Sequence, residues 1–128
     1  MQNELISTLS NVVTEAIVAE IGDSFYTLKV DGTRDPTECE NISIVIRFVN
    51  ETYDVTERLL IISTADKGDA QTLTDRVVAE FNKVGLDTSK ILSQVFDGAA
   101  LMSGKHGGVQ KLLQKKLGCD VRFLMYTV

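Results

Sequence analysis

The segment "ILSQVFDGAALMSGKHGGVQKLLQKKLG", residues 91–118, passes from a strand through a glycine-rich turn into a helix. Its first six residues are mostly apolar and predict a short buried strand. Its last ten repeat apolar side chains at helical spacing and end at Gly118, a natural helix stop. The turn between them holds Asp97, Lys105 and His106 among four glycines. A strand followed by a helix is typical of the crossover between parallel strands, so the segment favours an α/β fold.

The rest of the chain predicts a long helix, three consecutive strands, a second helix and a final strand. We expect helices at residues 3–21 and 70–84, and strands at 24–30, 40–50, 55–64 and 121–128. Both helices repeat apolar residues at helical spacing and end at a glycine. Either Asp69 or Thr72 would cap the second helix. The segment "DGTRDP", residues 31–36, reads as the turn that ends the first strand.

This order of elements predicts a mixed sheet. Three consecutive strands suggest an antiparallel meander, and strands separated by helices imply right-handed parallel crossovers. The order is one helix and then β-β-β-α-β-α-β, which among α/β architectures is the ribonuclease H-like one. At 128 residues with 44% hydrophobic content, we expect one domain. An N-terminal helix in residues 1–22 would precede the sheet and its flanking helices in residues 23–128.

The charge is unevenly distributed along the chain. Residues 1–97 hold 8 Lys/Arg against 17 Asp/Glu, whereas residues 98–128 hold 5 against the single Asp120. The net charge of −5 argues against indiscriminate affinity for nucleic acid. The basic end has two readings, a solvated helix face with cations near its C-terminal dipole or a region that contacts phosphate.

The cysteines and the N-terminus predict a cellular compartment. Cys39 and Cys119 are far apart and lack metal-ligand spacing, so we expect a reduced chain without a zinc site or disulfide. The first residues lack the pattern of a signal peptide, and no apolar run approaches membrane-spanning length. We therefore expect an intracellular protein, nuclear or cytoplasmic, that does not enter a membrane.

Asp31 and Asp97 are the candidate metal ligands. Each directly follows a predicted strand and precedes a glycine, in "KVDGT" and "VFDGA". If the first and fourth strands are parallel neighbours, both carboxylates lie at the same edge of the sheet. Two carboxylates together with substrate phosphate oxygens can hold Mg²⁺ or Mn²⁺. The alternative is ordinary turn chemistry, because Asp-Gly is common in turns.

The glycine-rich turn does not match a nucleotide-binding P-loop. Five residues rather than four separate Gly98 from Gly104, and His106 stands where that motif requires Ser or Thr. Lys105 remains a candidate phosphate contact. His106 has no nucleophile or orienting acid assigned by spacing, so we interpret it as a polar surface residue.

Two motifs carry a resemblance to a known family. They are "VDGTRDPTECENISIVIRFVN", residues 30–50, and "VFDGAALMSGKHGGVQKLL", residues 95–113. They resemble the transposase-derived domain of hAT-type DNA transposons and of host proteins related to the zinc finger MYM-type group, over nearly the whole chain. The resemblance implies a ribonuclease H-like fold. It also implies that Asp31 and Asp97 correspond to the first two of three catalytic acids, which bind divalent metal for DNA strand cleavage and joining.

The sequence departs from this family in several places. Leu101 stands where the family often has Asn. The third catalytic acid, the helical insertion, the dimerising C-terminal region and the DNA-binding zinc finger have no counterpart here. We therefore expect a truncated or domesticated remnant in which Asp31 and Asp97 are vestigial catalytic residues. Mg²⁺ or Mn²⁺ would be able to bind but would not be required.

These observations leave two functional hypotheses. The first is a transposase-derived module that is inactive alone and acts by protein interaction or weak nucleic-acid contact. The second is a metal-dependent nuclease or transposase fragment that uses Asp31 and Asp97 and is completed by another chain. The final strand would present a free sheet edge, which predicts a homodimer through that edge.

Overall fold

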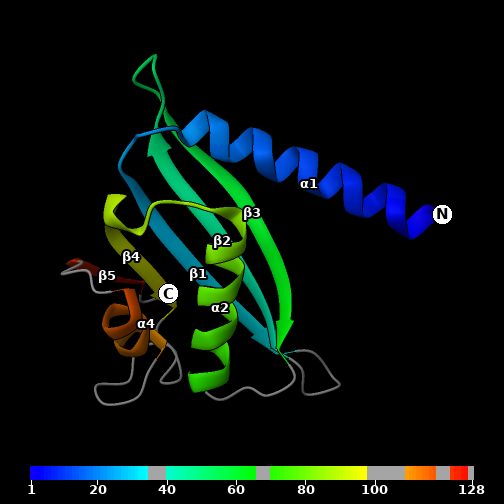
Figure 1. Cartoon of the computed structure of the whole chain (residues 1–128). Coiled ribbons are helices and arrows are strands. Elements are labelled where there is room, and N and C mark those ends of the chain that lie inside the picture. Colours follow the sequence, from blue (N-terminus) through cyan, green and yellow to red (C-terminus); the bar gives the residue numbers. More distant parts are fainter. Residues whose placement is uncertain (35–39, 66–69, 98–108, 118–121, 127–128) are drawn as a thin grey trace.

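The computed structural model describes residues 1–34, 40–65, 70–97, 109–117 and 122–126. The elements are helix α1 (Gln2–Ile21), strands β1 (Tyr26–Arg34), β2 (Glu40–Val49) and β3 (Val55–Ala65), helix α2 (Ala70–Val84), strand β4 (Ile91–Asp97), helix α4 (Val109–Leu117) and strand β5 (Arg122–Tyr126) (Figure 1). The predicted order is confirmed. A short 3₁₀ turn at Thr88–Lys90, which was not predicted, precedes β4.

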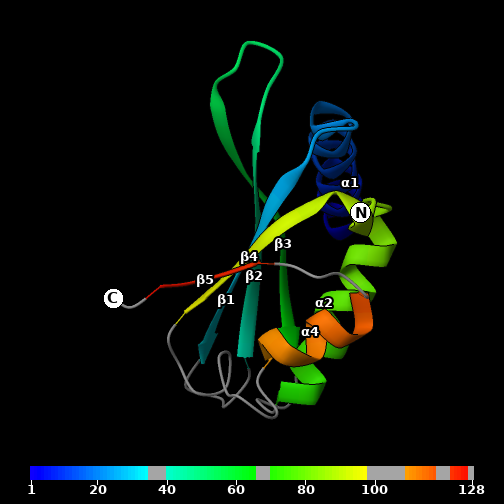
Figure 2. The same cartoon turned by 90° about the vertical axis from the view of Figure 1, so that its left-hand side faces the viewer.

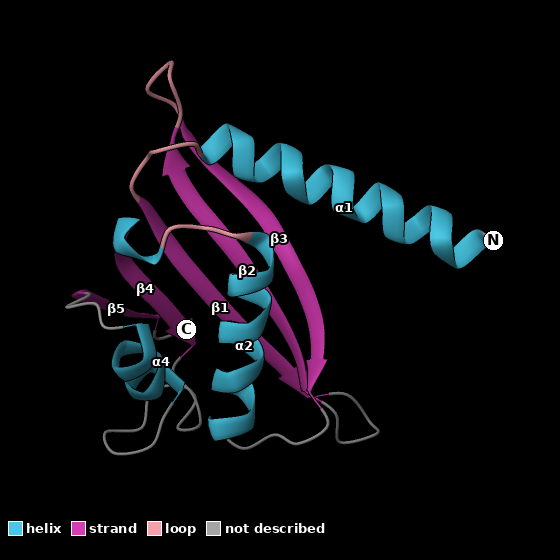
Figure 3. Cartoon of the chain, viewed as in Figure 1, coloured by secondary structure: helices cyan, strands magenta, loops and turns pink. Residues whose placement is uncertain are grey.

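The five strands form one mixed sheet in the order β3-β2-β1-β4-β5. Strand β2 is antiparallel to both β1 and β3, while β1 pairs in parallel with β4, and β4 with β5. The predicted meander and the predicted parallel crossovers are therefore both present (Figure 3). Strands β3 and β5 are the two edges of this sheet.

The helices lie on one face of the sheet. Figure 2 shows α1, α2 and α4 on the same side, with the opposite face not covered by any helix in the described ranges. We call this opposite face the uncovered face. An antiparallel sheet region tolerates one solvated face if its side chains alternate in polarity. Strand β1 does so, because Leu28 and Val30 are buried whereas Asp31 is exposed.

The core lies between the sheet and its helices. Alternate residues of β1 and β2 are buried there, against the apolar stripe of α2 and one leucine of α4. These residues are Tyr26, Leu28, Val30, Ile42, Ile44, Ile46, Phe48, Leu73, Val77, Phe81 and Leu113. The rings of Tyr26 and Phe81 are 6.2 Å apart between centroids, which joins β1 to α2.

Strand β1 is longer than the sequence predicts. The predicted turn at residues 31–36 is wrong for its first four residues, because β1 continues to Arg34. Asp31 pairs with Ser43 of β2, and Gly32 pairs with Ile42. The ladder with β2 satisfies these backbone groups, and this long-range pairing overrides the local turn preference of Asp-Gly. Residues 35–36 of the predicted turn lie outside the described part.

The two long helices end where the sequence predicts. Gly22 follows α1 and Gly85 follows α2, and both adopt positive φ, at 54° and 76°. Glycine reaches this region without the steric cost that a Cβ imposes. Thr72 lies inside α2 and is not its cap, and Asp69 lies outside the described residues.

Helix α1 is anchored by its C-terminal part alone. Ile17 and Ile21 are buried, whereas residues 1–13 are exposed and extend past β3, away from the sheet (Figure 1). Arg58 of β3 binds Glu20 through two donors, Nε and Nη2, each 3.1 Å from a carboxylate oxygen. Among the helices of the described ranges, none is long and apolar enough to cross a membrane.

Candidate functional site

The carboxyl ends of β1 and β4 form the predicted site. The parallel pairing of these strands ends with Val30 opposite Phe96, and each of these residues is followed by an aspartate. The predicted adjacency and direction of the two strands are confirmed. Asp31 and Asp97 therefore occupy equivalent positions at the same end of adjacent strands. The side chain of Asp97 lies outside the described part, so a shared metal ion stays a prediction.

Asp31 is held in the sheet by its pairing with Ser43 of β2. Its side chain is exposed, while the preceding Val30 points into the core. The hydroxyl of Ser43 donates a hydrogen bond to the Asp31 carbonyl oxygen at 3.5 Å. The carboxylate thus projects from a fixed backbone, which is what a metal ligand requires.

A charged cluster lies on the uncovered face near Asp31. Lys29 Nζ is 3.2 Å and Arg47 Nη1 is 3.5 Å from Glu57 Oε1, so one carboxylate serves two cations across β1, β2 and β3. All three side chains are partly exposed, and such pairs add little to stability. Sequence analysis missed this cluster. The strand register, which aligns Lys29, Arg47 and Glu57 across the face, was the information it lacked.

A hydroxyl pair joins β1 to β4 on the approach to the site. Thr27 Oγ1 and Ser93 Oγ are 2.8 Å apart. These two residues are paired in the parallel ladder, four residues before Asp31 and Asp97 respectively. The pair helps to hold the register of β1 and β4 that places the two aspartates at equivalent positions.

Within the described residues, no group of three His, Cys, Asp or Glu side chains is arranged to hold a metal ion. Asp31 and Asp97 would therefore need further oxygen ligands from substrate, water or another part of the chain. Two further acids, Asp66 and Asp75, follow the third strand in the sequence. Asp75 lies on α2, where it contacts Lys116 of α4 and accepts a hydrogen bond from Gln71, so it connects the two helices. Asp66 lies outside the described residues.

The glycine-rich turn connects β4 to α4, as the sequence predicts. Residues 98–108, which include Lys105 and His106, lie outside the described part. The contact between Lys105 and phosphate stays a prediction. The basic residues of α4 that are described, Lys111, Lys115 and Lys116, are exposed.

Gln94 is an unusual core residue three positions before Asp97. It is 0% exposed and pairs with Leu28 in the ladder, facing the helices. Neither amide atom has a hydrogen-bond partner within the described part of the chain. A buried amide without partners is costly, so this side chain weakens the fold close to the candidate site.

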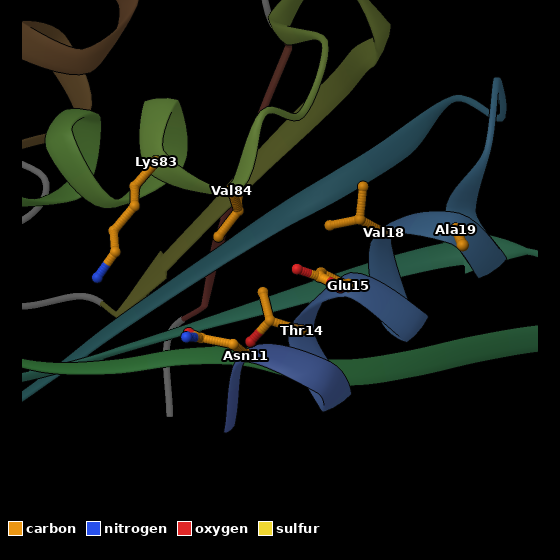
Figure 4. Close-up of a pocket in the computed structure, with 7 residues that line it drawn as sticks. All are labelled: Asn11, Thr14, Glu15, Val18, Ala19, Lys83 and Val84. Atoms are coloured by element: carbon orange, nitrogen blue, oxygen red, sulfur yellow. The ribbon is translucent and has the colours of Figure 1, made fainter. Parts of the chain in front are cut away.

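A groove with polar and apolar lining residues lies between α1 and α2, away from the two aspartates. One pocket of about 400 Å³ is lined by Asn11, Thr14, Glu15, Val18, Ala19, Lys83 and Val84. Figure 4 shows Thr14, Glu15 and Val18 on the side of α1 that faces Val84 of α2. An adjoining pocket of about 430 Å³ extends along β3 to Arg76 and Glu80. Arg76 is already bound there, to Ser63 at 2.6 Å and to Glu80 at 3.3 Å.

A family comparison agrees with this geometry. The family described as "ZMYM1/FAM200, RNase-like domain" matches residues 1–108, which run from α1 through β4 and the glycine-rich turn. The chain belongs to this family. The match confirms the resemblance inferred from the two motifs. In this RNase-like domain, α4 and β5 lie beyond the matched residues. No curated protein and no solved structure matched the chain.

Proposed function

We propose that this RNase-like domain is a transposase-derived module that does not cleave nucleic acid alone and acts inside the cell by binding protein. The observation that carries the proposal is the uncovered face of the sheet. Large apolar side chains lie exposed on it along β2 and β3, at 47% to 68% exposure: Val49, Val55, Leu59 and Ile62. Monomeric soluble proteins rarely leave such side chains grouped on one face without a binding role.

The pairing of β2 with β3 places these side chains on the same face. Val49 pairs with Val55, and Ser43 pairs with Ile62, in register with the exposed side of β2. The cluster of Lys29, Arg47 and Glu57 lies among them. Protein interfaces combine apolar side chains with charged groups, and the charged groups are commoner at the rim than at the centre.

Catalysis by the isolated domain is disfavoured by its charge and its carboxylates. Two-metal phosphoryl transfer needs enough fixed oxygens to hold both ions. Asp31 and Asp97 are the two carboxylates that the strand register aligns. The net charge of −5 also limits accumulation on DNA, so nucleic-acid contact would be weak.

The first test is a cleavage assay. The chain and its Asp97→Asn variant are incubated with Mn²⁺ and labelled duplex or hairpin DNA. We expect no cleavage by either protein. Robust cleavage that Asp97→Asn abolishes would overturn the proposal.

The second test addresses binding through the uncovered face. Proximity labelling in cells is compared for the original chain, a Leu59→Asp/Ile62→Asp variant and an Asp31→Asn variant. We expect the face variant to lose labelled partners that Asp31→Asn retains. The reverse pattern would place the function at the two aspartates.

A metal-dependent nuclease completed by another chain is the second candidate. The parallel register that makes Asp31 and Asp97 level favours it. Mg²⁺ or Mn²⁺ held by these carboxylates would neutralise and orient a phosphate group. Lys105 would contact the same phosphate. Cleavage restored by adding a second chain, and lost in Asp31→Asn, would favour this candidate over the first.

A further inference from the structure

Helix α1 presents a continuous apolar stripe to solvent. Leu5, Ile6, Leu9, Val12 and Val13 are 56% to 62% exposed, and Ala16 is exposed beside them. We call these six residues the α1 stripe. Their spacing of three and four residues places them on one side of the helix. Five of them, all except Ile6, belong with Ile17 to the apolar periodicity that predicts the helix, yet all six are exposed.

The domain contacts a different side of α1. Ser10, Asn11 and Thr14 line the groove toward α2, and Ile17 and Ile21 enter the core. Between Ser10 and Glu15 the residues that face the domain are therefore polar, while the α1 stripe faces away from the domain. A helix usually shows the opposite arrangement when its own domain is its only partner.

An uncovered stripe of this kind leaves α1 weakly supported. Its tertiary contacts are concentrated at Ile17, Glu20 and Ile21. Isolated helices of this length are marginal in water, and most helical stability comes from burial of an apolar face. Covering the α1 stripe would therefore stabilise the first three turns of the helix.

We propose that the α1 stripe pairs with the α1 stripe of a second copy of this chain, antiparallel and about a two-fold axis near Leu9 and Val12. This arrangement places Leu5 opposite Ala16 and Leu9 opposite Val12. A leucine then meets a smaller side chain in both of these pairs. A two-fold axis uses the same surface on both copies, so the contact closes as a dimer.

The charges of α1 select the antiparallel direction. The helix contains Glu4, Glu15 and Glu20 and neither Lys nor Arg, and no stripe residue is charged. Glu20 lies on the same side of the helix as the stripe, four residues after Ala16, so a parallel pair would bring the two Glu20 side chains together. In the antiparallel pair, Glu20 of each copy lies near the N-terminus of the partner helix, where the helix dipole favours a negative charge.

The size of the stripe predicts a weak dimer. The six side chains would bury on the order of 500 Å² from each copy, which is at the lower end for specific protein contacts. We therefore expect a dimer that forms and dissociates with concentration. This interface is separate from the uncovered face of the sheet.

Analytical ultracentrifugation of the full chain over a wide concentration range tests the proposal. We expect a monomer–dimer equilibrium, and Leu9→Asp should raise its Kd by about tenfold or more because the residue lies at the centre of the contact. Leu92→Asp is the matched control, since Leu92 of β4 is a leucine of nearly the same exposure as Leu9 and lies outside α1. It should leave the Kd unchanged. A chain that is monomeric throughout, or a dimer that persists in Leu9→Asp, as one formed through the β5 edge would, overturns the proposal.

Disulfide trapping tests the direction without a disruptive substitution. Leu5→Cys and Ala16→Cys chains, both also carrying Cys39→Ser and Cys119→Ser, are mixed and oxidised at a concentration at which the original chain is dimeric. We expect the mixed disulfide between the two variants to exceed either self-linked dimer. Predominant self-linkage of the Leu5→Cys chain, or no linkage at concentrations where the chain is dimeric, overturns the antiparallel pairing.

Discussion

The hydroxyl of Tyr26 donates a hydrogen bond to the carbonyl oxygen of Asp87 at 2.7 Å, which fastens the start of β1 to the turn ahead of β4. Tyr26 is buried and its ring lies against Phe81. The Tyr26 side chain therefore connects the core to the turn at Asp87 that precedes β4.

Tyr26→Phe should lower the free energy of unfolding by about 1 kcal/mol, because the ring stays and one partly buried hydrogen bond is lost. Urea unfolding measures the change. Tyr53→Phe is the matched control, since Tyr53 is 89% exposed in the β2–β3 turn. Equal effects of the two substitutions would contradict a role for the Asp87 contact.

Asp87 predicts a pH dependence of stability. Its side chain accepts hydrogen bonds from the Ser89 hydroxyl at 2.7 Å and the Ser89 backbone N–H at 2.9 Å, and these bonds hold its pKa below the usual value. The ionised form is therefore favoured by folding, so its contribution is present above the unfolded pKa and is lost as the pH falls through the lower folded pKa.

The free energy of unfolding should accordingly fall in Asp87→Ala near neutral pH, and the difference from the original chain should shrink on acidification. Thermal unfolding followed by circular dichroism at several pH values measures this difference. Ser89→Ala should lower the free energy of unfolding by less, and this difference should also shrink on acidification. A difference that grows as the pH is lowered would rule out this account.

Gln94 predicts a stabilising substitution. Replacing its buried amide with the apolar side chain of similar length in Gln94→Met should raise the free energy of unfolding by about 1 kcal/mol, since the cost of an unpartnered amide disappears. Gln94→Ala is the comparison and should lower stability, because it leaves a cavity. Denaturant midpoints that fall in both variants would indicate that the amide is satisfied in solution.

Asp31 and Asp97 predict weak binding of Mn²⁺. Asp31→Asn or Asp97→Asn alone should weaken it by about tenfold or more, because each removes one of two anionic ligands. Electron paramagnetic resonance of free Mn²⁺ measures the binding. Asp23→Asn, an exposed aspartate in the α1–β1 connection, is the control. Equal Mn²⁺ affinity in all four proteins would show that the pair is not a metal site.

Local patterns predicted most of the fold. In β2, Ile42, Ile44, Ile46 and Phe48 recur at every second position, and all four are buried in the core. The apolar residues at helical spacing in α2 include Leu73, Val77 and Phe81, which form its buried side. Each of these elements has one polar and one apolar side, so its own residues predict which side faces the core. The order of elements then restricted the sheet to a mixed topology.

Long-range contacts account for what the sequence did not predict. The extension of β1 past Asp31 depends on its pairing with β2, and the exposure of the α1 stripe depends on how the helix is anchored. The burial of Gln94 could not be predicted from its own segment, because it depends on the pairing with Leu28 of β1. For the candidate site, sequence analysis placed the two aspartates level, whereas Glu57 and its two cations required the register.

The different lengths of the ladders around β1 affect how the two aspartates move. Pairing of β1 with β2 continues to Arg34, whereas its pairing with β4 stops at Val30. Asp97 pairs instead with Tyr126 of the edge strand β5. Asp31 should therefore share the slow hydrogen exchange of the central sheet, while Asp97 follows the faster opening of an edge. The opening of strand β5, which supplies neither aspartate, would then determine how long Asp31 and Asp97 stay at equivalent positions.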